Sequence, residues 1–256
     1  MGLVIRHNMA AQAAYRNLSA TYRGLAESIN ALSSGLRINS ADDDAAGLAV
    51  RELMRAEVAG LSQGVRNASD AISMLQTFDG AAQVIDEKLT RMKELAMQAS
   101  TGTYSDTQRS LMQDEFDQMR SEINRIANAT SFNEIYGLNA SATIKIHFGT
   151  GNSSAQDYYY ITEQNMTSSA LGLDALTIAS QASAQAALTA IDSAISTKDT
   201  ARAHFGAMMN RLENTISNLE IQRENIQAAE SQISDVDVAW EMASLTRSQV
   251  LAQAGV

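Results

Sequence analysis

The chain of 256 residues contains no proline. At the usual frequency of roughly 5%, about a dozen prolines would be expected in a chain of this length. Proline breaks the interior of an α-helix because it lacks a hydrogen-bond donor and its ring clashes with the preceding turn. The absence of proline therefore permits unusually long, uninterrupted helices.

Composition and charge narrow the class of protein. Hydrophobic residues make up 45% of the chain and aromatic residues only 5%, which favours slender helical layers over one wide globular core. The formal net charge of −10 argues against a nucleic-acid partner, because phosphate binding requires a basic face. The chain has no cysteine, which excludes a disulfide framework, a thiolate metal site and a cysteine nucleophile.

The amino-terminal residues do not resemble a cleavable signal peptide. Residues 1–8 lack the apolar stretch of roughly seven to fifteen residues that such a leader requires. No apolar run reaches the roughly 18 residues of a membrane span. We therefore expect no membrane insertion, and a chain that is cytoplasmic or leaves the cell without a cleaved leader.

Apolar residues at alternating steps of three and four predict a coiled-coil-like helix over most of the first forty residues. The members of this seam are Val4, Ala11, Tyr15, Leu18, Tyr22, Leu25, Ile29, Leu32 and Leu36, with Asn8 as the one polar member. Gly35 interrupts the seam. The three carboxylates of residues 42–44 follow, where they favour the positive end of a new helix.

A second helix is predicted from about Asp43 to about Ala99, with a slip of one residue in its apolar register between Leu75 and Phe78. Residues 105–108 have the pattern of a capping box, which predicts the start of a third helix. The turn between the second and third helices should make them antiparallel.

The most regular segment predicts a long helix over residues 182–233, in which Lys198 and Arg202 are polar members of the seam. Ser234 is the predicted cap of a short terminal helix that ends near Ala254. Alternating apolar and polar residues predict a β-hairpin at about 143–162.

Candidate chemical sites are weak in this sequence. The three carboxylates of residues 42–44 are a candidate cation site, but consecutive helical positions point in different directions. His7, His147 and His204 lie on three separate elements and form no zinc motif, and Gly149–Gly151 is not followed by the Gly-Lys-Ser/Thr of a phosphate loop. We expect no catalytic residue, no metal, no cofactor and no enzyme activity.

Residues 31–50, ALSSGLRINSADDDAAGLAV, resemble the signature of bacterial flagellins. Further motifs that are similar to the family occur at residues 8–12, 17–19, 205–207, 210–212, 232–237 and 247–255. The resemblance covers both ends and nearly all of the helical part, in the expected order. It implies a filament subunit used in motility, which is exported unfolded through the flagellar type III apparatus and polymerises outside the cell beneath a cap.

The expected fold class is mainly α: a long antiparallel helical rod, resembling a coiled-coil bundle, with a small β-hairpin region and paired terminal helices. The resemblance implies that residues 1–42 and 235–256 form the two parts of an inner-tube helical domain and that residues 43–234 form the rod domain. Family members usually carry variable outer domains where this chain has only residues 163–180. They also usually continue beyond the Leu-Ala-Gln-Ala-Gly motif, so the carboxyl-terminal part is expected to be shortened.

The terminal seams are predicted to pack between subunits, since a thin monomer cannot bury them and a rotation that does not close generates an open filament. The residues expected in this packing are Leu18, Leu25, Ile29, Leu32, Leu36, Leu245 and Leu251. The resemblance further implies an export chaperone on the carboxyl-terminal segment, and hook-associated and cap proteins, as partners.

Residues 89–98 are similar to the epitope by which animal receptors of the Toll-like class recognise flagellins. Leu89, Arg91, Leu95 and Gln98 are its candidate contacts, and the alternative interpretation is an ordinary helix with core and surface positions. The rival hypothesis for the whole chain is a cytoplasmic signalling or scaffold hairpin of the chemoreceptor type. Such a hairpin should lack the strand segment.

Overall fold

A computed structural model describes residues 8–140, 142–154 and 156–255, and the chain divides into two compact units. The terminal unit comprises Met1–Gly60 and Ile221–Val256, and the middle unit comprises Leu61–Glu220. The described residues form five helices and one two-stranded antiparallel sheet. The expectation of a mainly α fold with long helices, a small hairpin and paired terminal helices is confirmed.

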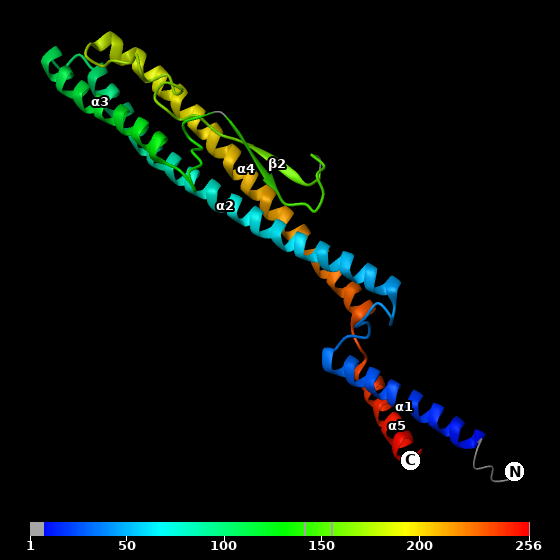
Figure 1. Cartoon of the computed structure of the whole chain (residues 1–256). Coiled ribbons are helices and arrows are strands. Elements are labelled where there is room, and N and C mark those ends of the chain that lie inside the picture. The colour runs from blue at the N-terminus through cyan, green and yellow to red at the C-terminus, as the bar shows by residue number, and fades with distance from the viewer. Residues whose placement is uncertain (1–7, 141, 155, 256) are drawn as a thin grey trace. The chain divides into compact units, whose positions relative to one another are not determined.

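The terminal unit contains the helices α1 (Met9–Ser34) and α5 (Val238–Ala254), which pack against each other (Figure 1). The side chain of Asn8 accepts hydrogen bonds from the first turn of α1, and Gly35 ends the helix in the left-handed region at φ 73°. α5 begins at Asp237, whose carboxylate accepts from the backbone N–H groups of Ala239 and Trp240.

The prediction that Ser234 caps the terminal helix is wrong. Ser234 is the last residue of α4 (Gln181–Ser234) and only 2% exposed, and the cap lies three residues later at Asp237. Asp237 is the cap because its carboxylate accepts hydrogen bonds from two backbone N–H groups of the first turn, which have no partner within the helix.

Most of α2 (Ala45–Ser100) and α4 belongs to the middle unit, where the two helices run side by side with α3 (Asp106–Ala129), as Figure 1 shows. The predicted register slip in α2 is wrong, because its buried positions alternate by three and four without a break. These positions are Leu61, Gly64, Ala68, Ala71, Leu75, Phe78, Ala82, Ile85, Leu89, Met92, Ala96 and Ala99. Six of these twelve positions are glycine or alanine, and such small residues let neighbouring segments approach closely.

The turn between α2 and α3 is closed by polar contacts. Ser105 and Gln108 form the predicted capping box. The buried guanidinium of Arg109 donates to the carbonyl oxygens of Ala99 and Thr101, both at 2.8 Å. These contacts satisfy carbonyl groups that the end of α2 leaves without a helical partner.

The predicted hairpin is present as β1 (Thr143–His147) and β2 (Tyr158–Thr162), with Ile144 opposite Ile161. It approaches α2 so closely that a Cβ atom added to Gly64 would lie 1.9 Å from the carbonyl oxygen of Phe148. The segment that follows β2 is hydrogen-bonded to α3. The side chain of Asn124 in α3 donates to the hydroxyl of Ser168 at 2.7 Å and accepts from the backbone N–H of Ser168 at 2.9 Å.

Three ion pairs join α2 to α4 among the described residues of the middle unit, and one of them links Lys93 to Asp192 at 2.6 Å. Lys198, whose side chain is 2% exposed, lies 2.5 Å from Asp86, and Arg202 lies 2.7 Å from Asp79. These are the polar members of the predicted α4 seam, and polar pairs at seam positions are a known means of fixing helix register. None of the helices that the structure describes has an apolar stretch long enough to cross a membrane.

Candidate assembly surface of the terminal unit

The two breaks in the terminal unit are hydrogen-bonded to each other. Leu36 and Asp235 form an isolated antiparallel bridge, and the backbone N–H of Arg37 donates to the Ser234 carbonyl at 2.6 Å. The Arg37 guanidinium adds a bond of 2.7 Å to the carbonyl of Ile233. The segment that follows α1 is thereby held to the segment that precedes α5, almost 200 positions away in the sequence.

The turn before α2 is organised by carboxylates. Hydrogen bonds from the backbone N–H groups of Ser40 and Asn39 lower the pKa of Asp43. Asp44 accepts from the N–H of Gly47 at 2.9 Å in the first turn of α2. The two carboxylates therefore stabilise the turn and the helix start, as the sequence suggested for residues 42–44.

The contact between α1 and α5 uses one half of the predicted α1 seam. Leu18, Leu25 and Leu32, seven residues apart, are half-buried. The contact also uses small residues: Gly24 lies beside Ser248, and Ser28 and Ala252 are 3% and 6% exposed.

The other half of the same seam faces solvent. Tyr15, Tyr22 and Ile29 alternate with the three leucines at steps of three and four, and they are 74%, 51% and 49% exposed. A coiled-coil seam buries both sets of positions when its partner helices are complete. Within this chain α1 therefore buries one of the two sets.

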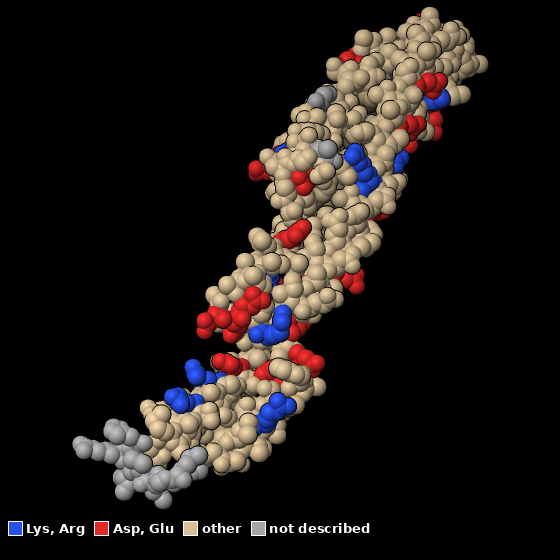
Figure 2. Space-filling model, turned by 90° about the vertical axis from the view of Figure 1, so that its right-hand side faces the viewer, with Lys and Arg blue, Asp and Glu red and all other residues tan. Residues whose placement is uncertain are grey.

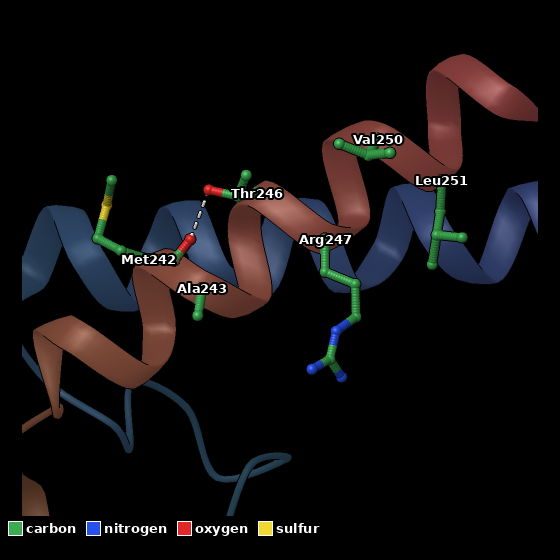
Figure 3. Close-up of a pocket in the computed structure, with 6 residues that line it drawn as sticks. All are labelled: Met242, Ala243, Thr246, Arg247, Val250 and Leu251. Carbon is green, nitrogen blue, oxygen red and sulfur yellow. Dashed lines mark hydrogen bonds between the residues drawn. The ribbon is translucent and has the colours of Figure 1, made fainter.

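The outer face of α5 carries a hollow of about 580 Å³, shown in Figure 3. Its lining residues are Met242, Ala243, Thr246, Arg247, Val250 and Leu251. The hydroxyl of Thr246 donates to the carbonyl of Met242 at 2.8 Å, which satisfies it within the helix. Arg247 is the one charged residue of the lining, and so this face is predominantly apolar.

The terminal unit as a whole exposes its large hydrophobic residues. Of the 17 exposed large hydrophobic residues in the described part of the chain, 12 belong to this unit, whereas it holds only two of the 35 buried hydrophobic residues, Ile38 and Ala252. On the face seen in Figure 2, charged side chains are sparse and separated by uncharged surface. Extended apolar surface of this kind marks an interaction site.

The structure places the seven predicted packing residues in two groups. Leu18, Leu25, Leu32, Leu36 and Leu245 are half-buried within the chain. Ile29 and Leu251 are 49% and 54% exposed. The most exposed apolar residues of the unit were not among the predicted site residues: Met9, Tyr15, Leu53 and Trp240 are each 68% exposed or more. Tyr15 belonged to the recognised seam, but α5 shows no comparable periodicity that singles out Trp240.

Comparison with known proteins identifies the family. Residues 5–143 match the family described as the bacterial flagellin N-terminal helical region, and residues 188–256 match the bacterial flagellin C-terminal helical region. The chain belongs to the bacterial flagellin family. Flagellins are structural proteins rather than enzymes, and this flagellin is a structural subunit of the flagellar filament.

Individual relatives of this flagellin span almost its entire length. The flagellin of Halalkalibacterium halodurans is 42% identical over 253 residues, which cover 98% of this chain and 93% of the relative. A flagellar filament 31.3 kDa core protein of Treponema maltophilum is 38% identical over 270 aligned positions, with 99% and 93% covered. The crystal structure of Bacillus cereus flagellin is similar with a TM-score of 0.54 and 32% identity, over 64% of this chain and 94% of that one.

Two of the four candidate receptor contacts of this flagellin lie in its core. Leu89 is 0% and Leu95 is 2% exposed. Arg91 is on the surface and pairs with Glu115 and Glu94, both at 2.8 Å. Gln98 is also on the surface and donates to the hydroxyl of Tyr104 at 2.9 Å. Of the four candidate contacts, Arg91 and Gln98 are therefore the two that another protein could reach from the surface.

Proposed function

We propose that the exposed apolar residues of the terminal unit form the surface through which copies of this flagellin pack in the filament. The residues of this assembly surface are Tyr15, Tyr22, Ile29, Trp240, Met242, Val250 and Leu251. The observation that carries the proposal is the divided seam of α1, with three half-buried leucines on one side and three exposed apolar residues on the other.

Burial of these residues supplies a driving force for assembly. A large apolar side chain contributes roughly 1.5–3 kcal/mol when it moves from water into a packed interface. The partner is a second copy, because a surface that contacts a different surface of an identical neighbour without closing a ring generates an open helical filament. In this proposal residues 1–42 and 235–256 belong to the inner tube, and residues 43–234 to the rod.

The experiment compares two pairs of exposed tyrosines. The double variant Tyr15→Ser and Tyr22→Ser removes two rings from the assembly surface. The control variant Tyr136→Ser and Tyr160→Ser removes two rings of similar exposure, 45% and 56%, from the middle unit. Assembly is measured by sedimentation and negative-stain electron microscopy after seeding at high protein concentration.

We expect the first variant to remain soluble and the control to form tubes like the wild type. Circular dichroism should show the same helix content in all three chains. The proposal fails if the first variant assembles at the wild-type critical concentration. Replacing Leu25 and Leu32 with Asp should also abolish assembly while the middle unit stays folded, because it separates α1 from α5.

We also infer the partners of the subunit before and after assembly. Export through the flagellar type III apparatus requires a chaperone that covers apolar surface, and the outer face of α5 offers such surface. Hook-associated and cap proteins are the expected neighbours at the filament ends. A pull-down of the chaperone by wild-type chain, but not by a chain with Val250 and Leu251 replaced by Ser, tests the first contact.

Recognition by a Toll-like receptor is proposed through Arg91 and Gln98, since these two candidate residues are accessible. Replacement of both by Ala should lower reporter-cell activation by the soluble chain. Unchanged activation would remove these residues from the contact, and absence of activation by the wild type would remove the receptor as a partner.

A further inference from the structure

The described methionines of this chain range from buried to largely exposed. The buried ones include Met74, Met92 and Met166, which are at most 3% exposed. Met9, Met97 and Met242 are 68%, 59% and 47% exposed. A thioether reacts with an oxidant at a rate that depends on access, so these three exposed methionines are more open to attack in the soluble chain than the half-buried Met54, Met112, Met119 and Met209.

Met242 differs from the other two in its surroundings. It lies at one end of the hollow on the outer face of α5, with Thr246 and Val250 following it at helical spacing. Figure 3 shows that the side chains of Met242 and Arg247 point to opposite sides of α5. The single charged group of the lining is therefore turned away from the thioether.

We propose that Met242 is a reversible oxidation site through which a peroxide controls the assembly of this chain. The inference rests on the assembly surface proposed above. Hydrogen peroxide transfers one oxygen atom to the sulfur, so that the thioether becomes a sulfoxide and the peroxide is reduced to water. A sulfoxide reductase reverses the step, in which two thiols form a disulfide and the oxygen leaves as water.

Oxidation of Met242 would make an apolar part of the proposed assembly surface polar. The sulfoxide oxygen is a hydrogen-bond acceptor, and its burial in an apolar contact without a donor is unfavourable. Thr246 already donates to the backbone carbonyl of Met242, and Arg247 points the other way. The oxidised subunit therefore enters the filament less readily, and we expect its critical concentration for assembly to rise about tenfold.

The experiment uses the full chain as wild type, Met242→Leu, Met97→Leu and Met9→Leu. Each protein is treated with hydrogen peroxide, the oxidant is removed, and mass spectrometry of peptides measures the sulfoxide at each position. Assembly is then measured before treatment, after treatment and after incubation with a methionine sulfoxide reductase and dithiothreitol. Met242→Gln, an uncharged polar mimic of the sulfoxide, is measured without oxidant.

We expect treatment to suppress assembly of the wild type, Met97→Leu and Met9→Leu relative to each protein's own untreated sample, and the reductase to restore it. Met242→Leu should assemble to the same extent before and after treatment, whatever its untreated level. Met242→Gln should assemble as poorly as the oxidised wild type. The inference is overturned if Met242→Leu is as sensitive as the wild type, if fully oxidised wild type assembles normally, or if Met242→Gln assembles normally. Failure of the untreated wild type to assemble would instead overturn the assembly surface and, with it, this inference.

Discussion

α1 of the terminal unit and the long helices of the middle unit share the same spacing of apolar residues, but the two units differ in where their apolar residues lie. In the middle unit, residues from α2, α3, α4 and the hairpin bury one another in a continuous core. Among its described residues, the terminal unit buries only two hydrophobic residues, Ile38 and Ala252, and leaves twelve large hydrophobic residues exposed, nine of them in α1 and α5. The spacing of apolar residues therefore predicts that a helix packs against partner helices, but not whether those partners lie in the same chain or in a neighbouring one.

The number of helices available explains the contrast. Each helix of the middle unit meets at least one other long element, so its apolar stripe is covered within the chain. α5 has only 17 residues and covers one half of the α1 seam. A stripe wider than its single intramolecular partner remains open, and in the proposed filament the neighbouring subunits cover it.

The largest expected effect tests whether folding stability resides in the middle unit. Phe205 is 1% exposed, and its ring centroid lies 6.4 Å from that of Phe78. Phe205→Ala should lower the free energy of unfolding by about 3–5 kcal/mol through the cavity it leaves. Trp240→Ala, in the terminal unit and 68% exposed, should change it by less than about 0.5 kcal/mol and instead weaken assembly. Urea unfolding of the dilute chain measures the free energy of unfolding of both variants. Equal losses of stability would show that the two units do not differ in this respect.

The next effect concerns the approach of the hairpin to α2. Gly64→Ala places a Cβ atom against the carbonyl oxygen of Phe148 and should destabilise the middle unit by roughly 1–3 kcal/mol. Gly80→Ala is the matched control in the same helix, because no atom lies within 4 Å of the added Cβ. It should stabilise the unit by about 1 kcal/mol. Thermal unfolding distinguishes the two, and similar shifts for both variants would exclude tight docking of the hairpin.

A smaller effect should appear at the ion pairs between α2 and α4. Asp86→Asn should cost about 1–2 kcal/mol, because Asp86 is partly exposed and Asp199 keeps a contact with Lys198. Burial alone would lower the pKa of Lys198, but hydrogen bonds from its ammonium to Asp199 and Asp86 outweigh burial and raise it.

The sign of the pH dependence follows from that raised pKa. The stabilisation by charged Lys198 is complete below the ordinary lysine pKa of about 10.4 and is lost as the pH rises through the higher folded-state value. Wild-type stability should therefore fall more steeply above about pH 10.4 than that of Lys198→Met. Unfolding titrations of the two chains between neutral and alkaline pH measure the difference. Parallel curves would show that the pair does not contribute.

The smallest expected change in stability is that of the turn around Asp43, in the terminal unit, at acid pH. Hydrogen bonds from the N–H groups of Ser40 and Asn39 lower the pKa of Asp43, so its contribution is present above the ordinary aspartate value and is lost as the pH falls through the lower folded-state value. Asp43→Asn should remove this dependence. Hydrogen exchange of residues 38–47 below pH 4 in both chains checks it, and identical exchange would contradict the assignment.

Much of the secondary structure was predictable because its causes are local. The absence of proline allowed long helices, Gly35 supplied the left-handed residue that ends α1, and Ser105 with Gln108 opened α3. The hairpin followed from alternation over a few residues. The predicted hairpin also argued against the rival hypothesis of a chemoreceptor-type signalling protein, which should lack strands. The family resemblance pointed to the terminal helices as the assembly region.

Other features were missed because they depend on what each helix meets. Gly64 and Ala71 do not stand out as apolar positions, yet both are buried, Gly64 where the carbonyl of Phe148 approaches α2 and Ala71 in the core of the middle unit. Leu89 and Leu95 were candidate receptor contacts because their residue types matched the epitope, and the fold turns both into the core.

The sequence alone determined that this chain forms long helices and that its first helix carries an apolar seam, because helix propensity, capping and spacing act over a few neighbouring residues. The tertiary structure decided which half of the α1 seam is covered. Leu18, Leu25 and Leu32 are half-buried where α1 meets α5, while Tyr15, Tyr22 and Ile29 stay exposed, since burial depends on the position of a partner that no local pattern contains.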